Sequence, residues 1–306
     1  MNNAMEQVQA DRAPEPSAAT PVEHIRRYLS LVKFSHTIFA MPFAMIGFFL
    51  AVREEGVNGF WRTLILVVLA MVFARSAAMG FNRWLDEKYD RQNPRTATRE
   101  IPAGVIKKSS ALAFVLLNAA LFVVVAWFLN PLCFLLSPVA LAVILGYSYT
   151  KRFTAFCHLV LGLGLSLAPI GAYLAVTGHF SLEPVLFSLV VLGWVSGFDI
   201  IYALQDDVFD QAHALHSIPV WLGRRRGLVF STVLHVFSAA LVVAAGIYGE
   251  YSWLYWLGAA IFAGMLIYQH LLVKPQDLRR VNIAFMTANG VASCVFAVFV
   301  ITALFI

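Results

Sequence analysis

The stretch from residue 61 to residue 90 reads WRTLILVVLAMVFARSAAMGFNRWLDEKYD, and its character changes near the end. Residues 61–82 are mostly apolar and match the roughly 20 residues that a helix needs to cross the hydrocarbon of a bilayer. The polar group Asn82-Arg83-x-x-Asp86-x-x-x-Asp90 follows at once. This order predicts a membrane-spanning helix that carries two carboxylates, one helical turn apart, at one of its ends.

Apolar runs of the same kind fill the rest of the chain. Of its 306 residues, 60% are hydrophobic and only 13% are charged, whereas about a quarter of the residues in a soluble domain are charged. This composition excludes soluble enzymes and predicts an all-α, polytopic membrane protein. Nine runs have the length of a membrane span, namely 34–53, 61–82, 110–129, 132–149, 154–176, 184–205, 227–248, 252–273 and 283–305. We expect a bundle of nine transmembrane helices.

The distribution of basic residues predicts how this bundle lies in the membrane. With nine spans, the N-terminal segment and every second loop share one side, and all but three of the 22 Lys and Arg residues (Arg53, Arg62 and Arg75) fall there. Such an asymmetry places the N-terminus in the cytoplasm, in the cytoplasmic (inner) membrane of the cell. Residues 1–22 are expected to be a disordered cytoplasmic tail, and 23–306 the membrane domain. The scattered positive charges predict contact with lipid headgroups and exclude a nucleic-acid-binding face.

A second acidic motif ends the sixth predicted span. It reads Asp199-x-x-Tyr202-x-x-x-Asp206-Asp207-x-x-Asp210, and on a continuous helix its members except Asp207 share one stripe. If the second span also continues as a helix, then Arg75, Asn82, Asp86 and Asp90 share one face. Carboxylates one turn apart repel each other, so two such stripes indicate bound cations. The two pairs begin 120 residues apart and are expected to face each other across one cavity.

The residues around these motifs indicate a diphosphate bound through Mg²⁺. This ion prefers a few carboxylate oxygens and takes its remaining ligands from water and phosphate. Arg and Lys complete a phosphate site through charge-assisted hydrogen bonds, and Arg95, Arg99, Lys151 and Arg152 lie close to the motifs or just after the fourth span. A diphosphate on a long hydrocarbon would place its head at the cytoplasmic rim and its tail in lipid.

Two other classes of protein compete with this interpretation. A cation-coupled transporter also has intramembrane carboxylates and helices interrupted by Gly and Pro, but its acidic residues are expected near the midplane. A purely structural bundle leaves the two aspartate stripes unexplained. No feature of the sequence requires a protein partner.

The two motifs resemble those of the UbiA superfamily of intramembrane aromatic prenyltransferases. The likeness covers nearly the whole chain after the tail and includes Tyr147-x-x-x-Lys151-Arg152 after the fourth span. The stretch from Asn93 to Gly104 and the sequence 216–219 look most similar to the 4-hydroxybenzoate polyprenyltransferase branch, including relatives that prenylate a dihydroxynaphthoate. Arg83 stands where many members have Asp, which bears on the acceptor.

The resemblance implies transfer of a polyprenyl group from polyprenyl diphosphate to a ring carbon of an aromatic acid in quinone biosynthesis. It implies one Mg²⁺ on Asp86 and Asp90 and a second on Asp206 and Asp210. The diphosphate would be bound by Arg95, Arg99, Lys151 and Arg152. The residues expected to bind the acceptor or shield the allylic cation are Asn82, Arg75, Asp199, Tyr202 and Tyr147. Relatives that prenylate haem or chlorophyll precursors remain open as alternatives.

Overall fold

The computed structural model describes residues 21–33 and 39–306 and contains helices but no β-strand in these ranges. The first predicted span, 34–53, therefore begins outside the described residues. Most of the predicted tail, 1–22, also lies outside them. The helices are α2 (Pro21–Leu31), α3 (Met41–Glu55), α4 (Phe60–Leu85), α5 (Glu87–Gln92), α6 (Lys108–Leu129), α7 (Pro131–Thr150), α8 (Cys157–Thr177), α9 (Leu182–Ala203), α10 (Asp207–Ala212), α11 (Ile218–Tyr248), α12 (Trp253–Leu272), η2 (Ile283–Ala288) and α13 (Asn289–Ala303).

Within the described residues, eight helical segments are long and apolar enough to cross a membrane. They correspond to the second to ninth predicted spans, and this confirms an all-helical, polytopic architecture. Helix α3 has 15 residues and, at 1.5 Å per residue, is shorter than the roughly 30 Å of hydrocarbon in a bilayer. The ninth span and the orientation of the N-terminus stay predictions.

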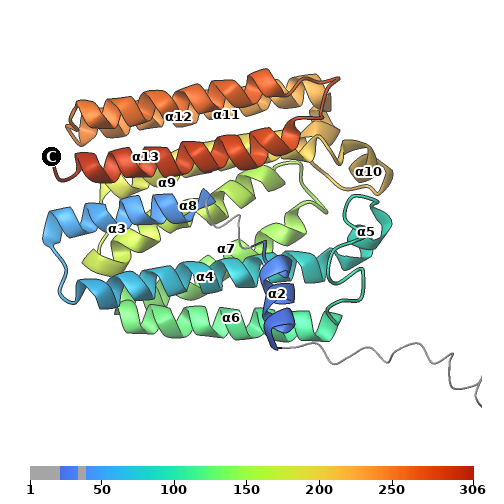
Figure 1. The fold of residues 1–306 in the computed structure, drawn as a ribbon, viewed down its shortest axis with the longest axis horizontal. Coiled ribbons are helices and arrows are strands. Elements are labelled where there is room, and N and C mark those ends of the chain that lie inside the picture. Colours follow the sequence, from blue (N-terminus) through green and yellow to red (C-terminus); the bar gives the residue numbers. More distant parts are fainter. Residues whose placement is uncertain (1–20, 34–38) are drawn as a thin grey trace, which may run out of the picture.

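The long helices lie side by side, and the two short helices α5 and α10 meet at one end of the bundle (Figure 1). The C-terminus lies at the opposite end. We call the end that carries α5 and α10 the motif end, because both aspartate motifs of the sequence lie there.

Helix α9 forms the centre of the bundle and packs against α8 and α11. Its apolar side chains reach an aromatic core shared with α3, α12 and α13, in which Phe43, Trp194, Phe262 and Phe296 are fully buried. The ring centroids of Phe43 and Trp194 lie 5.2 Å apart, and those of Phe262 and Phe296 lie 5.0 Å apart. This core fixes the position of α9, which carries the second motif at its end.

Close helix contacts depend on small residues, as is usual where lipid supplies no hydrophobic drive between helices. Gly47 of α3 lies against α8, and a Cβ added there would stand 1.9 Å from the carbonyl oxygen of Pro169 and 2.7 Å from its carbonyl carbon. These are backbone atoms of a helix, so they cannot rotate aside.

We expect Gly47→Ala to lower the stability of the protein by about 1–3 kcal/mol, because α3 and α8 must separate to admit the methyl group. Gly171→Ala in α8 is the matched control, since no atom lies within 4 Å of its added Cβ. The control should raise stability slightly through the gain in helix propensity. Thermal unfolding in detergent measures both, and equal melting temperatures would contradict this packing.

Candidate functional site

Both aspartate motifs straddle a break between a long helix and a short one. Helix α4 ends at Leu85, and Asp86 has φ −90° and ψ 6° before α5 begins. In the second motif α9 ends at Ala203, and Asp206 has φ −109° and ψ 1° before α10 begins. The expectation that each helix continues through its motif is therefore wrong. The breaks turn α5 and α10 across the end of the bundle.

A cavity of about 220 Å³ lies between the two motifs. All of the sequence-predicted site residues line it except Arg75, which lies deeper in α4. The residues brought together are Asn82, Asp86, Asp90, Arg95, Arg99, Tyr147, Lys151, Arg152, Asp199, Tyr202, Asp206 and Asp210. The two motifs therefore face one cavity, as their spacing predicted.

Lys151 and Arg152, which follow α7, reach one aspartate from each motif. The Arg152 Nη2 donates to Asp86 Oδ1 at 2.9 Å, and Lys151 Nζ lies 2.8 Å from Asp210 Oδ2. Asp86 Oδ2 also accepts a 3.1 Å hydrogen bond from the side-chain amide of Asn82. Two neighbouring cations thus bridge segments that are more than a hundred residues apart in the sequence.

Arg95 crosses from the first motif to the second. Its Nε and Nη2 donate to both oxygens of Asp206, at 2.9 and 2.5 Å, and its Nη1 donates to the hydroxyl of Tyr202 at 3.1 Å. The turn at Asn93-Pro94 makes this possible, because Pro94 cannot continue α5 and Asn93 is extended there. The Asn93 side chain accepts from the Arg95 N–H at 3.0 Å and donates to Asp206 at 3.1 Å.

The remaining pair joins Asp90 to Arg99 of the same loop, with 2.7 Å between Oδ1 and Nη1. Each of the four aspartates therefore has one of the four predicted diphosphate-binding cations as its partner. Asp90 Oδ2 is buried and accepts no hydrogen bond from the described residues. Asp90 itself lines the cavity.

Burial and pairing with cations shift the pKa values of these carboxyl groups in opposite directions. Burial raises the pKa of Asp86 and of Asp210, and the positive charges of Arg152 and Lys151 offset this only in part. Burial would also raise the pKa of Asp206, but its hydrogen bonds with Arg95 and Asn93 hold that pKa below its usual value. Asp206 is therefore the most firmly ionised of the three.

The predicted acceptor residues divide between the cavity wall and the helix beneath it. Tyr202 packs against Phe285 with 4.2 Å between ring centroids, and the guanidinium of Arg95 lies 5.5 Å from the centroid of its ring. The Arg75 Nε is buried in α4 without a hydrogen-bond partner among the described residues.

Several polar residues of the cavity were not assigned a role by the sequence analysis, among them Asn93 and His158. Asn93 stands in a quoted motif, so its closeness to the site was foreseeable, although its bond to Asp206 was not. His158 in α8 lines the cavity and lies 2.7 Å from Asp199, measured from Nδ1 to Oδ2. The signal that could have found it is an ionisable residue within an apolar span.

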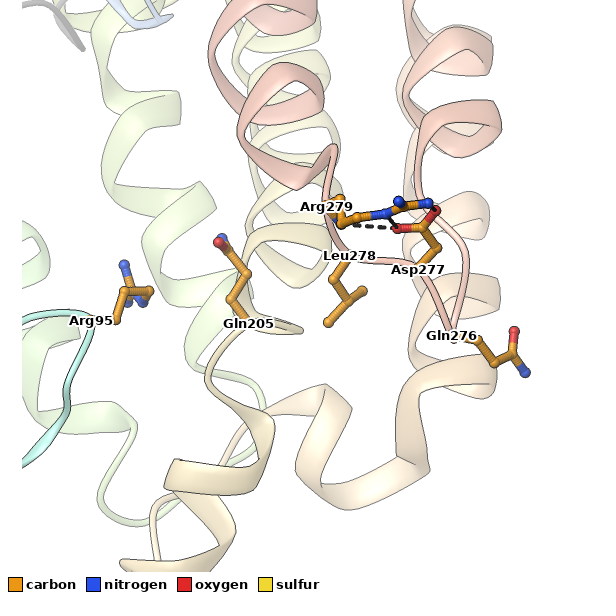
Figure 2. A pocket seen from close by; sticks show the side chains of 6 residues that line it. All are labelled: Arg95, Gln205, Gln276, Asp277, Leu278 and Arg279. Atoms are coloured by element: carbon orange, nitrogen blue, oxygen red, sulfur yellow. Dashed lines mark hydrogen bonds and ion pairs between the residues drawn. The ribbon is translucent and has the colours of Figure 1, made fainter.

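A wider, open hollow of about 610 Å³ adjoins the cavity at the motif end. Figure 2 shows Arg95 at one edge, Gln205 beside it, and the turn from Gln276 to Arg279 at the other edge. Arg279 is held by Asp277 of the same turn, with 2.7 Å between Nη2 and Oδ2. Arg95 lines both the hollow and the cavity, so the two spaces meet at this side chain.

Comparison with known proteins places this geometry in a family. The model of the UbiA prenyltransferase family matches residues 40–291. The chain belongs to the UbiA prenyltransferase family. It is similar to a 4-hydroxybenzoate octaprenyltransferase of Aliivibrio fischeri, with 30% identity over 77% of this chain and 82% of the relative. It is also similar to one of Tolumonas auensis, with 31% identity over 80% and 85% of the two chains.

Solved structures agree with the family and the fold. A UbiA homologue of Aeropyrum pernix in its apo state superposes with a TM-score of 0.78 and 33% identity, over 87% of this chain and 97% of that one. A UbiA homologue of Archaeoglobus fulgidus, bound to GPP and Mg²⁺, superposes with a TM-score of 0.71 and 18% identity, over 92% of this chain and 100% of that one. At this identity the likeness shows the fold alone. The protein is a prenyltransferase of this family, which decides between the enzyme and the transporter.

The pairing predicts how the site responds when one cation is removed. We expect Lys151→Met to destabilise the protein by about 2 kcal/mol, because Asp210, whose side chain is 1% exposed, loses its counter-charge. The loss should be largest at neutral pH and shrink as the pH falls, since protonation removes the unpaired charge from Asp210. Thermal unfolding in detergent across pH measures this.

The double variant Lys151→Met/Asp210→Asn should regain part of that stability, because no buried charge is left. Arg224→Met is the matched control: its partner Asp207 lies outside the cavity, and the more exposed pair should cost about 1 kcal/mol or less. A double variant as unstable as Lys151→Met alone would contradict the pairing.

Proposed function

We propose that the protein transfers a polyprenyl group from polyprenyl diphosphate to a ring carbon of an aromatic acid, in a Mg²⁺-dependent reaction that releases pyrophosphate. The acceptor is 4-hydroxybenzoate or a dihydroxynaphthoate, and the product belongs to quinone biosynthesis. The observation that carries this proposal is the cavity at the end of apolar helices in which four aspartates meet four cations. Membership of a prenyltransferase family supports the reaction type.

The carboxylates fit Mg²⁺ as two pairs. Asp86 and Asp90 are proposed to hold one ion, and Asp206 and Asp210 a second. No group of three His, Cys, Asp or Glu side chains converges on a metal position among the described residues. Each pair therefore leaves most of an octahedral shell to phosphate oxygens and water, which is the shell that Mg²⁺ prefers. Bound Mg²⁺ supplies Lewis-acid stabilisation of the negative charge on the departing pyrophosphate.

The four cations are proposed to bind the diphosphate oxygens. Arg95, Arg99, Lys151 and Arg152 already point into the cavity, each held by a carboxylate. When the diphosphate enters, each cation gains a phosphate oxygen as a partner. Charge-assisted hydrogen bonds of this kind stabilise the charge that builds as the allylic C–O bond breaks.

The acceptor is proposed to bind on the membrane side of this cation cluster. Asn82, Asp199 and Tyr147 line the cavity there, and the aromatic faces of Tyr147 and Tyr202 shield the allylic cation. Arg75 would bind the acceptor's carboxylate, which would satisfy the buried Nε that has no partner among the described residues. The names of the relatives favour an aromatic acid over haem or chlorophyll precursors.

The basic residues favour the cytoplasmic membrane as the location, with the motif end facing the cytoplasm. Anionic lipid headgroups would surround this rim, and the reaction requires neither a protein partner nor nucleic acid.

The test is pyrophosphate release by the purified protein in detergent, given a polyprenyl diphosphate with and without Mg²⁺, 4-hydroxybenzoate or a dihydroxynaphthoate. Release should need both Mg²⁺ and one of the acids. Asp86→Asn should abolish it, and Asp207→Asn, which alters an aspartate paired with Arg224 outside the cavity, should retain it. An Asp86→Asn variant with wild-type turnover would exclude the proposed metal ligand.

Arg75→Ala tests the acceptor assignment. We expect the KM for the aromatic acid to rise about 10-fold or more, as when a charge-assisted hydrogen bond is lost, with a much smaller change in the KM for the prenyl diphosphate. Arg75→Lys keeps the charge and should fall between the wild type and Arg75→Ala. The opposite pattern of KM changes would assign Arg75 to the diphosphate.

A further inference from the structure

His158 is a buried histidine in the wall of the cavity that the proposed reaction does not yet use. Its side chain is 4% exposed, and its Nδ1 lies 2.7 Å from Oδ2 of Asp199 on the neighbouring helix α9. The Asp199 side chain is 23% exposed and also lines the cavity. Both side chains line the cavity, and the carboxylate of Asp199 is the more exposed of the two.

The other ring nitrogen fixes which atom of His158 carries the proton. Its Nε2 lies 3.3 Å from the backbone N–H of Ile218, the first residue of α11, and accepts a hydrogen bond from it. The first N–H groups of a helix have no partner within the helix, so this donor is available. Because Nε2 accepts, the proton resides on Nδ1, which donates to Asp199.

Asp199 differs from every other aspartate of the cavity in its partner. Asp86, Asp90, Asp206 and Asp210 are each paired with an Arg or Lys. Asp199 has the imidazole of His158 as its partner, at Oδ2. A fixed positive charge stabilises the ionised form of a carboxylate and weakens it as a base. Asp199 is the only one of the five aspartates lining the cavity whose partner among the described residues is neither Lys nor Arg.

We propose that Asp199 is the base of the transfer reaction and that His158 is the residue that positions it. This rests on the proposed function. A carbon–carbon bond forms between the acceptor ring and C1 of the prenyl group, and the electron pair of the C1–O bond leaves with pyrophosphate. The hydrogen on the attacked ring carbon then leaves as a proton to Asp199, and its bonding pair restores the aromatic ring.

The experiment measures turnover with an acceptor that carries deuterium at the position that is prenylated. In the wild type we expect loss of the ring proton to be fast, so that the deuterated acceptor reacts at the same rate as the unlabelled one. Asp199→Asn should lower kcat by about 100-fold or more and reveal a primary isotope effect. His158→Leu should lower kcat by about 10- to 100-fold with the same isotope effect, while the KM of the acceptor stays near the wild-type value.

His158→Asn is the matched variant, because its amide nitrogen stands at about the position of Nδ1 and still donates to Asp199. It should recover most of kcat and lose the isotope effect. His158→Gln places its amide near Nε2 instead, so it should remain slow. If His158→Leu fails to fold, the comparison of His158→Asn with His158→Gln still tests whether His158 positions Asp199.

A fall in kcat without an isotope effect in His158→Leu and Asp199→Asn would overturn the proposal and leave His158 a packing residue. Variants with wild-type kcat would also overturn it. Either result leaves the proposed function intact, since the wild type still prenylates the acid. If the wild type forms no prenylated ring with any aromatic acid, the proposed function fails, and the role of Asp199 and His158 fails with it.

Discussion

The pairing of four carboxylates with four cations is the interaction on which the motif end depends. Carboxylates one turn apart repel each other, and partial burial removes the water that would screen them. Cations from other segments offset this repulsion and loss of hydration. Arg152 pairs with Asp86, and Lys151 pairs with Asp210. Arg95 pairs with Asp206. These contacts tie the ends of α4, α7 and α9 together. The same charges that make the site possible thus hold its parts in place.

This arrangement also explains how one site can be folded without a ligand and still receive a highly charged one. Mg²⁺ and a diphosphate carry opposite charges. In the proposed reaction the carboxylates would bind Mg²⁺ while Arg95 and Lys151 would bind phosphate oxygens, so each of these charges would have a partner of opposite sign. A site built from carboxylates alone would repel the diphosphate, and one built from cations alone would repel the metal.

The sequence predicted what depends on periodicity and missed what depends on contacts between helices. Apolar runs of span length became helices, and the 120-residue separation of the two aspartate pairs correctly predicted that both motifs face one cavity. The breaks at Asp86 and Asp206 were not predicted, because the local sequence contains no Pro or Gly at either junction. The contact between His158 and Asp199 was missed for a related reason. Asp199 lies 41 residues from His158 on another helix, and no spacing rule connects them.

The two motifs share their aspartate pairs and differ in the residues before them, where Asn82 corresponds to Tyr202 and Met79 to Asp199. Asp86 and Asp206 adopt similar backbone angles, and each accepts a backbone hydrogen bond from the aspartate four residues later, at 2.8 and 2.7 Å. Seven residues before Asp206 stands Asp199, whereas Met79 stands seven residues before Asp86. The proposed binding of two metal ions uses the aspartates that the motifs share. In the proposed reaction, the carboxylate that one motif has and the other lacks takes the ring proton, a step that happens once per turnover.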